Sequence, residues 1–397
     1  MTATSAQHTY NFPGKKHFDK ALPLYMAAIF CYIQLSPMYI FPRGIPQPAD
    51  ILIALTIFPA LIIIFLSSKK SIPDYYLAGA IFVALTMVIN WVNYLFYSDL
   101  RLLLSSTYYL YNFLIFTFAV YIFKHYAPQM RKLAYVAIII AIIVQFIWLT
   151  LFPDIGVKRM TGSFINPNQL GYWAMITFMT LTVLKHNQKF KWYDGILILI
   201  LTYFEALALS KGGMIAFGLA LAVIVCMPQV PKIGKALVVF GLLVMMIFGL
   251  FNVEKFGKVQ NSIGQVDLVV QRLQSIGQSE DDSAAGRNYD RLIQFPEFMI
   301  FGAGEGGFAR FDHHPNEIHS GIATLIFSYG IPGTLSYLAF LGLILIKRPW
   351  YYSALVFCIL LYGLTHQYMR FSDYWFFLGI LYASQYFPKQ IPKQIRA

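Results

Sequence analysis

Three clusters of polar and charged residues interrupt a largely apolar sequence, and each combines a cation with glycines or asparagines. The first cluster occupies residues 159–171, begins with Arg159 and leads into an apolar stretch. Its centre, Asn166-Pro167-Asn168, is typical of a turn and a helix N-cap, which would be a structural role. Alternatively, the arginine and the two asparagines bind the polar groups of a substrate.

The second cluster, Ser210-Lys211-Gly212-Gly213, separates two short apolar stretches. A lysine flanked by glycines at a broken helix can direct its ammonium group, together with free backbone N–H groups, at an anion. The alternative is a lysine whose stem lies in an apolar region while its charge reaches the interface. Glu205 lies in the preceding apolar stretch, where a carboxylate is costly to bury. We therefore expect it to pair with a basic residue such as Lys211 or to belong to an ion pathway.

The third cluster extends across several short motifs. They are Gly286-Arg287-Asn288, the glycine-rich stretch 302–308, and the segments 316–320 and 330–333. The glycines follow no strand of a βαβ unit, so they do not predict a nucleotide-binding fold. His319 is either a capping residue at a helix start or a general base, because an imidazole titrates near neutral pH. His313, His314 and His319 lack an ordinary zinc spacing, so the sequence predicts no metal site.

The composition indicates that these clusters belong to a membrane protein. The chain has 397 residues, of which 58% are hydrophobic and 12% are charged, whereas charged residues make up roughly a quarter of a typical soluble chain. Cys31, Cys226 and Cys358 lie inside apolar stretches, which argues against a disulfide framework. The formal net charge of +12 comes from small basic groups between apolar stretches, so the sequence predicts no nucleic-acid partner.

Apolar stretches long enough to cross about 30 Å of hydrocarbon recur along nearly the whole chain. They predict an all-α, polytopic integral membrane protein with about twelve transmembrane helices. The predicted spans are residues 21–40, 49–66, 75–97, 102–123, 133–152, 168–184, 195–209, 212–227, 235–251, 319–346, 350–365 and 372–387. The polar segment before them carries Lys15, Lys16 and Lys20 without a cleavage site, so we expect a cytoplasmic tail and not a signal peptide.

The basic residues indicate how this arrangement is oriented, because every loop on one side carries at least two lysines or arginines. The short loops on the other side are poorer in them and hold Arg43, Arg101, Lys158, Arg159, Lys211 and Arg370. The positive-inside rule therefore places both termini in the cytoplasm. Transmembrane helices one to nine then lie in residues 1–251, a large outer loop in 252–318, and helices ten to twelve with a cytoplasmic tail in 319–397. Within the loop, residues 266–273 and 288–299 can form short amphipathic helices on the membrane surface.

Taken together, the motifs resemble the signature of the O-antigen polymerase and ligase superfamily. The resemblance covers roughly residues 159–335 and is carried by the stretch 162–171, Ser210-Lys211-Gly212-Gly213, Gly286-Arg287, the stretch 301–308, and a histidine before Gly330-Ile331-Pro332-Gly333. Lys211 stands where the family usually has an arginine, and Arg287 matches the arginine that opens the second half of the large loop. His319 matches the histidine of a His-Asn motif, in which Ser320 replaces the asparagine.

The resemblance implies a GT-C type membrane glycosyltransferase in the bacterial inner membrane, with a large periplasmic loop and an active site that faces the periplasm. The implied reaction is an inverting transfer that needs neither a metal nor another cofactor, in which an acceptor hydroxyl displaces polyprenyl diphosphate from a glycan. His319 would accept the proton, and Arg287 and Lys211 would stabilise the leaving diphosphate. The expected substrate-binding residues are Arg159, Asn166, Asn168, Glu205, Glu317 and Arg370.

The same resemblance implies the partners of the protein. They are a polyprenyl-diphosphate-linked oligosaccharide donor and acceptor, the lipid bilayer and a co-polymerase that regulates chain length. A polymerase would join repeat units on the lipid carrier, whereas a ligase would move the finished glycan to a lipid A core with the same chemical groups. We favour a polymerase because polymerases are the more diverse class.

A secondary transporter or a flippase for lipid-linked glycans is the alternative from another functional class. It would also have twelve spans, short broken helices and a buried carboxylate. The two halves of this sequence show no convincing internal repeat, and the large outer loop lies late in the chain. We therefore favour the enzyme.

Overall fold

The computed structural model describes residues 15–42, 45–67, 74–152, 159–232, 234–236, 238–239, 286–311, 317–346 and 348–388. These residues form helices, turns and bends without a strand, which confirms the predicted all-α class for this part of the chain. The ninth predicted span lies largely outside the described residues, as does the large loop up to residue 285.

Each of the other predicted spans overlaps one helix. These helices are α1 (Lys15–Leu35), α2 (Pro48–Ser67), α3 (Asp74–Tyr97), α4 (Leu100–His125), α5 (Ala127–Leu151), α6 (Pro167–Leu184), α7 (Trp192–Ala208), α8 (Lys211–Val225), α13 (Gly321–Leu345), α14 (Trp350–Gly363) and α15 (Ser372–Ala383). Shorter elements are α11 (Asp290–Gln294), α12 (Phe298–Phe301), and the 3₁₀ helices η3 (Phe308–Arg310) and η4 (Ser384–Tyr386).

The described helices have the length and surface of a membrane-embedded protein. Four of them, α3, α4, α5 and α13, are long and apolar enough to cross a bilayer. Large apolar side chains on α3, such as Trp91, Leu95 and Phe96, are more than half exposed. A lipid environment accounts for such an exposed apolar face, because soluble proteins rarely carry large apolar patches. The total of twelve spans and the GT-C arrangement stay predictions.

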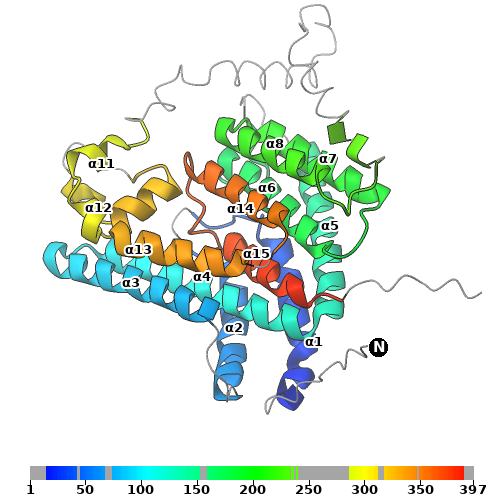
Figure 1. Ribbon diagram of the computed structural model, residues 1–397, viewed down its shortest axis with the longest axis horizontal. Helices are drawn as coiled ribbons and strands as arrows, with labels where there is room; N and C mark the ends of the chain where they lie inside the picture. Colours follow the sequence, from blue (N-terminus) through cyan, green and yellow to red (C-terminus); the bar gives the residue numbers. More distant parts are fainter. Residues whose placement is uncertain are drawn as a thin grey trace, which may run out of the picture.

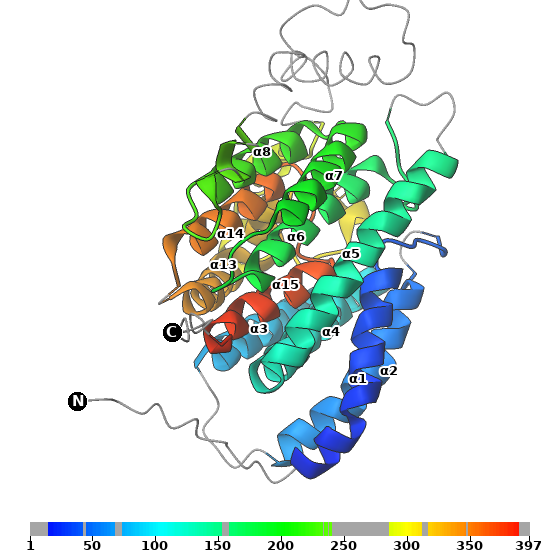
Figure 2. The ribbon, with the colours of Figure 1, turned by 90° about the vertical axis from the view of Figure 1, so that its right-hand side faces the viewer.

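The helices pack in three connected groups. Helix α3 contacts α4 and α13, and α4 contacts α15 (Figure 1). Helix α6 contacts α7 and α8, and α8 packs against α14. Helices α1 and α2 lie side by side along one edge, where α1 also contacts α5 (Figure 2). Helix α6 is buried from Leu170 to Leu184 and contacts α15, so it joins the groups at the centre of the bundle.

Helix α13 is broken at Gly330 and Pro332. Gly330 has a φ of 61°, a left-handed conformation that glycine adopts readily, and Pro332 cannot donate a hydrogen bond to the carbonyl group four residues earlier. The carbonyl oxygens of Phe327 and Ser328 instead accept hydrogen bonds of 2.9 and 2.8 Å from the backbone N–H groups of residues 303 and 304. The break in α13 therefore docks the glycine-rich loop onto the bundle.

The segment 288–299, expected to form one amphipathic helix on the membrane surface, forms the two short helices α11 and α12 instead. Pro296 separates them, because proline disfavours a helical conformation in the residue before it. Leu292, Phe295 and Phe298 pack against an apolar cluster that includes Phe311. This side of the segment is therefore covered by protein, whereas Ile293 and Phe301 are more than three-quarters exposed, and contact of the segment with the membrane surface stays a prediction.

Candidate functional site

A cavity of about 380 Å³ lies where helices α6, α8, α13 and α15 begin. Residues from well-separated parts of the chain line it. The predicted site residues in its described lining are Arg159, Asn166, Asn168, Lys211, Arg287, Glu317 and His319. The helices thus bring together side chains that the sequence places more than a hundred residues apart.

The segment before α6 forms one wall of the cavity. The side-chain oxygen of Asn166 accepts a hydrogen bond of 2.8 Å from the backbone N–H of Asn168, within a reciprocal capping box. The side-chain oxygen of Asn168 accepts a hydrogen bond from the guanidinium group of Arg159, whose Nε donates to the carbonyl oxygen of Ala208 (2.9 Å). Asn166 is therefore the predicted helix cap, and Asn168 holds Arg159 at the cavity.

Lys211 occupies the first position of α8, directly after a sharp change of direction. Leu209 ends α7 with a φ of 50°, in the left-handed region. The Ser210 side chain then caps α8 by accepting a hydrogen bond of 3.3 Å from the backbone N–H of Gly213. The predicted broken helix is thus present, and the first turn of α8 lies at the cavity together with the lysine.

Glu205 lies behind this turn and is absent from the described lining of the cavity. Its side chain is 2% exposed, and its two carboxyl oxygens accept no hydrogen bond from the described residues. The expected pair with Lys211 is therefore not formed in the described part of the chain, and the basic residue that acts electrostatically on Glu205 is Arg159. A Cβ atom at Gly213 would lie 2.2 Å from Glu205 Oε1, and one at Gly171 would lie 2.8 Å from Oε2. Two glycines thus make the room in which this carboxyl group packs.

Arg287 and His319 are tied together in another part of the wall. The backbone N–H of His319 donates to the carbonyl oxygen of Arg287 (3.2 Å), and the Arg287 guanidinium group donates to the carbonyl oxygen of Thr365. Ser320 caps α13 by accepting a hydrogen bond of 3.1 Å from the first turn, and its hydroxyl donates to the carbonyl oxygen of Gly363 (2.9 Å). The serine that follows His319 therefore fixes the start of α13 and places the histidine at the cavity.

The loop between α14 and α15 supplies lining residues 365–367, which the sequence did not reveal. The imidazole of His366 has its Nδ1 2.8 Å from Thr365 Oγ1 and stacks on the Tyr362 ring at 4.5 Å. Burial, and then the nearby charge of Arg287, lower the pKa of His366 to about 3. This imidazole is therefore neutral at physiological pH. A Thr-His-Gln run at the end of an apolar span was the signal in the sequence.

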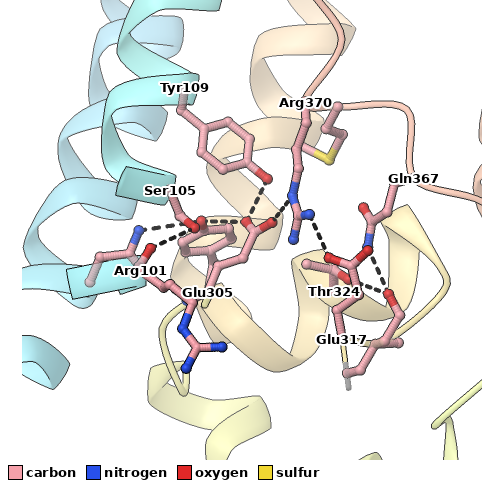
Figure 3. Close-up of polar contacts among 12 residues, drawn as sticks. Arg101, Ser105, Tyr109, Glu305, Glu317, Thr324, Gln367 and Arg370 are labelled. Atoms are coloured by element: carbon pink, nitrogen blue, oxygen red, sulfur yellow. Dashed lines mark hydrogen bonds and ion pairs between the residues drawn. The ribbon is translucent and has the colours of Figure 1, made fainter. Parts of the chain in front are cut away.

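Arg370 is absent from the described lining of the cavity. Its side chain lies between those of Glu305 and Glu317 (Figure 3). Its Nη1 donates to Glu317 Oε2 (2.6 Å), and its Nε donates to Glu305 Oε1. Glu305 Oε2 also accepts hydrogen bonds from the hydroxyls of Tyr109 (2.8 Å) and Tyr329 (2.6 Å). Burial opposes the charge on Arg370, but the two carboxylates outweigh this and raise its pKa. Burial likewise opposes the charge on Glu317, but Arg370 outweighs it and lowers the pKa of that carboxyl group.

The cavity therefore combines cations with groups that can accept a proton. Its described lining contains the cations of Arg159, Lys211 and Arg287, the imidazoles of His319 and His366, and the carboxylate of Glu317. Such a site can bind an anion next to a proton acceptor. His313 and His314 lie outside the described residues. Among the residues that the structure describes, no three histidine, cysteine, aspartate or glutamate side chains form a group that could hold a metal ion.

Neither a comparison with models of known protein families nor a comparison with curated proteins gives a match to this chain. The geometry of the cavity and the chemistry of the residues that line it are therefore the basis for inferring a function.

Proposed function

We propose that this chain is an inverting, metal-independent glycosyltransferase that polymerises oligosaccharide repeat units linked to polyprenyl diphosphate. The observation that carries the proposal is that Arg159, Lys211 and Arg287 line the same cavity as His319. The reaction requires positive charge for the diphosphate and a proton acceptor for the attacking hydroxyl. This cavity offers both, and it lies in a protein with membrane-embedded helices that can accompany a lipid-linked substrate.

The cations in the cavity can stabilise the negative charge of the leaving diphosphate. When the bond between the anomeric carbon and the diphosphate oxygen breaks, its electron pair stays on that oxygen and negative charge grows. Lysine and arginine side chains then stabilise the transition state more than the ground state. Helices α6, α8, α13 and α15 all begin at the cavity, and the N-terminal ends of helices add positive potential.

The histidine in the cavity can accept the proton that the attacking hydroxyl loses. The acceptor hydroxyl attacks the anomeric carbon from the face opposite the diphosphate, which inverts the configuration. Its proton passes to the imidazole of His319. The backbone N–H of His319 donates a hydrogen bond to the carbonyl oxygen of Arg287. The residue that accepts the proton and one of the cationic residues are therefore neighbours in the wall of the cavity.

The decisive test is to incubate purified full-length protein with a defined polyprenyl-diphosphate-linked repeat unit. We expect a ladder of products that differ by one repeat unit, and no ladder with the His319→Gln variant. Transfer of the intact glycan to a lipid A core without a ladder would establish a ligase instead. Movement of the lipid-linked glycan across a reconstituted bilayer at unchanged length would establish a flippase.

We also propose that the protein lies in the bacterial inner membrane with the cavity toward the periplasm, where a co-polymerase could regulate chain length. Ile293 on α11 is 82% exposed and suits a labelling test. In a variant that lacks Cys31, Cys226 and Cys358, Ile293→Cys should react with a membrane-impermeant thiol reagent in intact spheroplasts. Labelling that requires cell lysis would contradict this orientation.

A further inference from the structure

Glu305 is fully buried beside the cavity, where a charge is costly unless hydrogen bonds and opposite charge surround it. Its carboxyl oxygens accept hydrogen bonds from Tyr109, Tyr329 and Arg370. Its backbone N–H donates to Asn90 Oδ1 (2.8 Å). Three separate parts of the chain therefore hold the carboxylate of Glu305, and a fourth holds its backbone.

The backbone conformation of the glycine-rich loop directs the Glu305 side chain into the protein. Gly304 and Gly306, on either side of Glu305, have φ values of 71° and 120°, which residues with a side chain rarely adopt. A Cβ atom at Gly306 would also lie 2.6 Å from the backbone of Arg101 in α4. The loop therefore approaches α4 closely and directs Glu305 inward, toward Arg370.

Arg370 connects this buried carboxylate with the cavity (Figure 3). Its Nη1 donates to Glu317 Oε2, and the Glu317 side chain is 33% exposed and lines the cavity. Glu317 precedes His319 by two residues, and the two side chains are close enough to interact electrostatically. Glu305 is absent from the cavity lining, so it can influence the reaction through Arg370 but not by contact with a substrate.

The charges around His319 show why a second carboxylate is needed. Among the described residues, the cations around His319 are Arg159 before α6, Lys211 on α8, Arg287 in the described part of the large loop, and Arg370 between α14 and α15, where the neutral His366 also lies. An imidazole that gains a proton in this positive environment needs a nearby negative charge. Arg370 alone would neutralise Glu317. With Glu305 present, the group of two carboxylates and one guanidinium keeps a net negative charge at the cavity.

We propose that Glu305 is a positioning residue, which acts through Arg370 to keep the Glu317 carboxylate available as the counter-charge of the imidazolium formed on His319. This inference rests on the proposed function. In the transfer step, the hydroxyl proton moves to His319 and the electron pair of the broken bond leaves with the diphosphate. Glu317 stays ionised and takes no proton.

The test compares Glu305→Gln, which removes one charge and keeps the size of the side chain, with Glu317→Gln and Arg370→Gln. Diethyl pyrocarbonate modifies neutral imidazoles, so its reaction with His319 at several pH values, followed by mass spectrometry on the full-length protein, gives a titration midpoint without turnover. The midpoint should move to lower pH by roughly half a unit in Glu305→Gln and by roughly one unit in Glu317→Gln. In Arg370→Gln it should move to higher pH. Turnover of Glu305→Gln should fall about tenfold at an unchanged KM for the donor.

A matched control comes from a buried ion pair remote from the cavity. Lys185 Nζ lies 2.9 Å from Asp194 Oδ2, and the side chains are 8% and 5% exposed. Asp194→Asn removes a buried carboxylate of the same kind, and it should leave the His319 midpoint and the KM for the donor unchanged.

The double variant Glu305→Gln/Arg370→Gln removes both charges and should have a midpoint between those of the single variants. A contribution of Glu305 to folding alone would not produce shifts of opposite sign. If one single variant does not fold, the double variant is the reference for the other, because the two differ by one charge. Equal midpoints in the folded members of this set would overturn the role of Glu305. If the midpoints moved as expected but the wild-type protein made no polymer, the proposed function would fail and the charge coupling would stand.

Discussion

Two clusters of buried charges lie near opposite ends of the central helices and are built differently. At the end of α6 that is remote from the cavity, Lys185 pairs with Asp194, and both side chains are less than a tenth exposed. At the cavity end, Arg370 lies between Glu305 and Glu317, and Glu317 is one-third exposed. The ion pair at the first end has one carboxylate and one cation, whereas the ion-paired group at the second end has two carboxylates and one cation.

Under the proposed function, this difference would separate a structural ion pair from one that takes part in the reaction. In the buried pair, one cation and one carboxylate neutralise each other, and Tyr135 and the backbone N–H of Lys191 donate further hydrogen bonds to Asp194. The group at the cavity has an excess carboxylate, which can offset a positive charge gained by the neighbouring His319. Under the proposed function, the charge balance of each buried cluster indicates which end of the protein would carry out the reaction, and four predictions test that comparison.

The largest expected effect is the loss of activity on changing the residues that contact the reacting groups. Arg287→Ala and His319→Gln should each lower turnover by at least about a hundredfold, because one removes a cation at the leaving group and the other a proton acceptor. His319→Gln should still bind the lipid-linked donor. His186 hydrogen-bonds Tyr352 at the remote end (2.9 Å), so His186→Gln is the matched histidine control. Near wild-type turnover in His319→Gln would show that the histidine at the cavity is no more important for the reaction than the histidine at the remote end.

The second prediction concerns Lys211, for which the sequence left two interpretations. Lys211→Ala should lower turnover by roughly tenfold to a hundredfold if the ammonium group binds the diphosphate. Lys211→Arg should retain much of the activity, because it keeps the charge and adds a bidentate donor. The measurement is the ladder assay at equal amounts of folded protein. Full activity of Lys211→Ala would show that the lysine merely extends its charge to the interface.

The third prediction concerns stability at the remote end. Asp194→Asn should destabilise the protein by about 3 kcal/mol, because the Lys185 ammonium group stays buried without its partner. The double variant Lys185→Met/Asp194→Asn removes both charges while the amide oxygen can still accept a hydrogen bond from Tyr135 or from the backbone N–H of Lys191. It should recover most of that loss, and its turnover per folded molecule should equal that of the wild type. Thermal unfolding in detergent gives the first quantity and the ladder assay the second. A stable but inactive double variant would mean that this pair is more than structural.

The smallest effect is expected where glycines make room for Glu205. A methyl group at position 213 would overlap the Glu205 carboxyl group, so Gly213→Ala should destabilise the protein by about 1–3 kcal/mol. Gly218 lies in the same helix with nothing within 4 Å of an added Cβ atom. Gly218→Ala should therefore be neutral or stabilise by up to about 1 kcal/mol. Equal melting temperatures in the two variants would show that Glu205 moves aside easily.

Hydropathy predicted the helices well where lipid and core impose the same apolar pattern. The third predicted span was 75–97, and α3 occupies Asp74–Tyr97. Helix α5 begins at Ala127, six residues before the predicted span, because Arg131 and Lys132 interrupt the apolar pattern. Arg131 is nevertheless buried, since its guanidinium group donates to the carbonyl oxygens of Leu184 and His186. The residues next to Arg131 in the sequence do not show that its side chain caps another helix.

The same limit explains which parts of the site were missed. Arg159, Lys211, Arg287 and His319 stand in short motifs whose composition is unusual for an apolar chain, so the sequence alone indicated them. Glu305 reads as one acidic residue among several in a hydrophilic loop. Its partners come from α4, α13 and the loop after α14. Contacts between residues so far apart in the sequence leave no sign in the residues around Glu305.

The break in α13 has a consequence for how this protein tolerates change. The carbonyl oxygen of Ser328 accepts the N–H of Gly304 because Pro332 has no N–H to offer it. In Pro332→Ala, a new amide would compete for that oxygen, and a more regular helix would loosen the loop that carries Glu305. A substitution of Pro332 that makes α13 more regular would thus weaken the site. Selection for activity would retain this proline, whereas selection for helix stability alone would remove it.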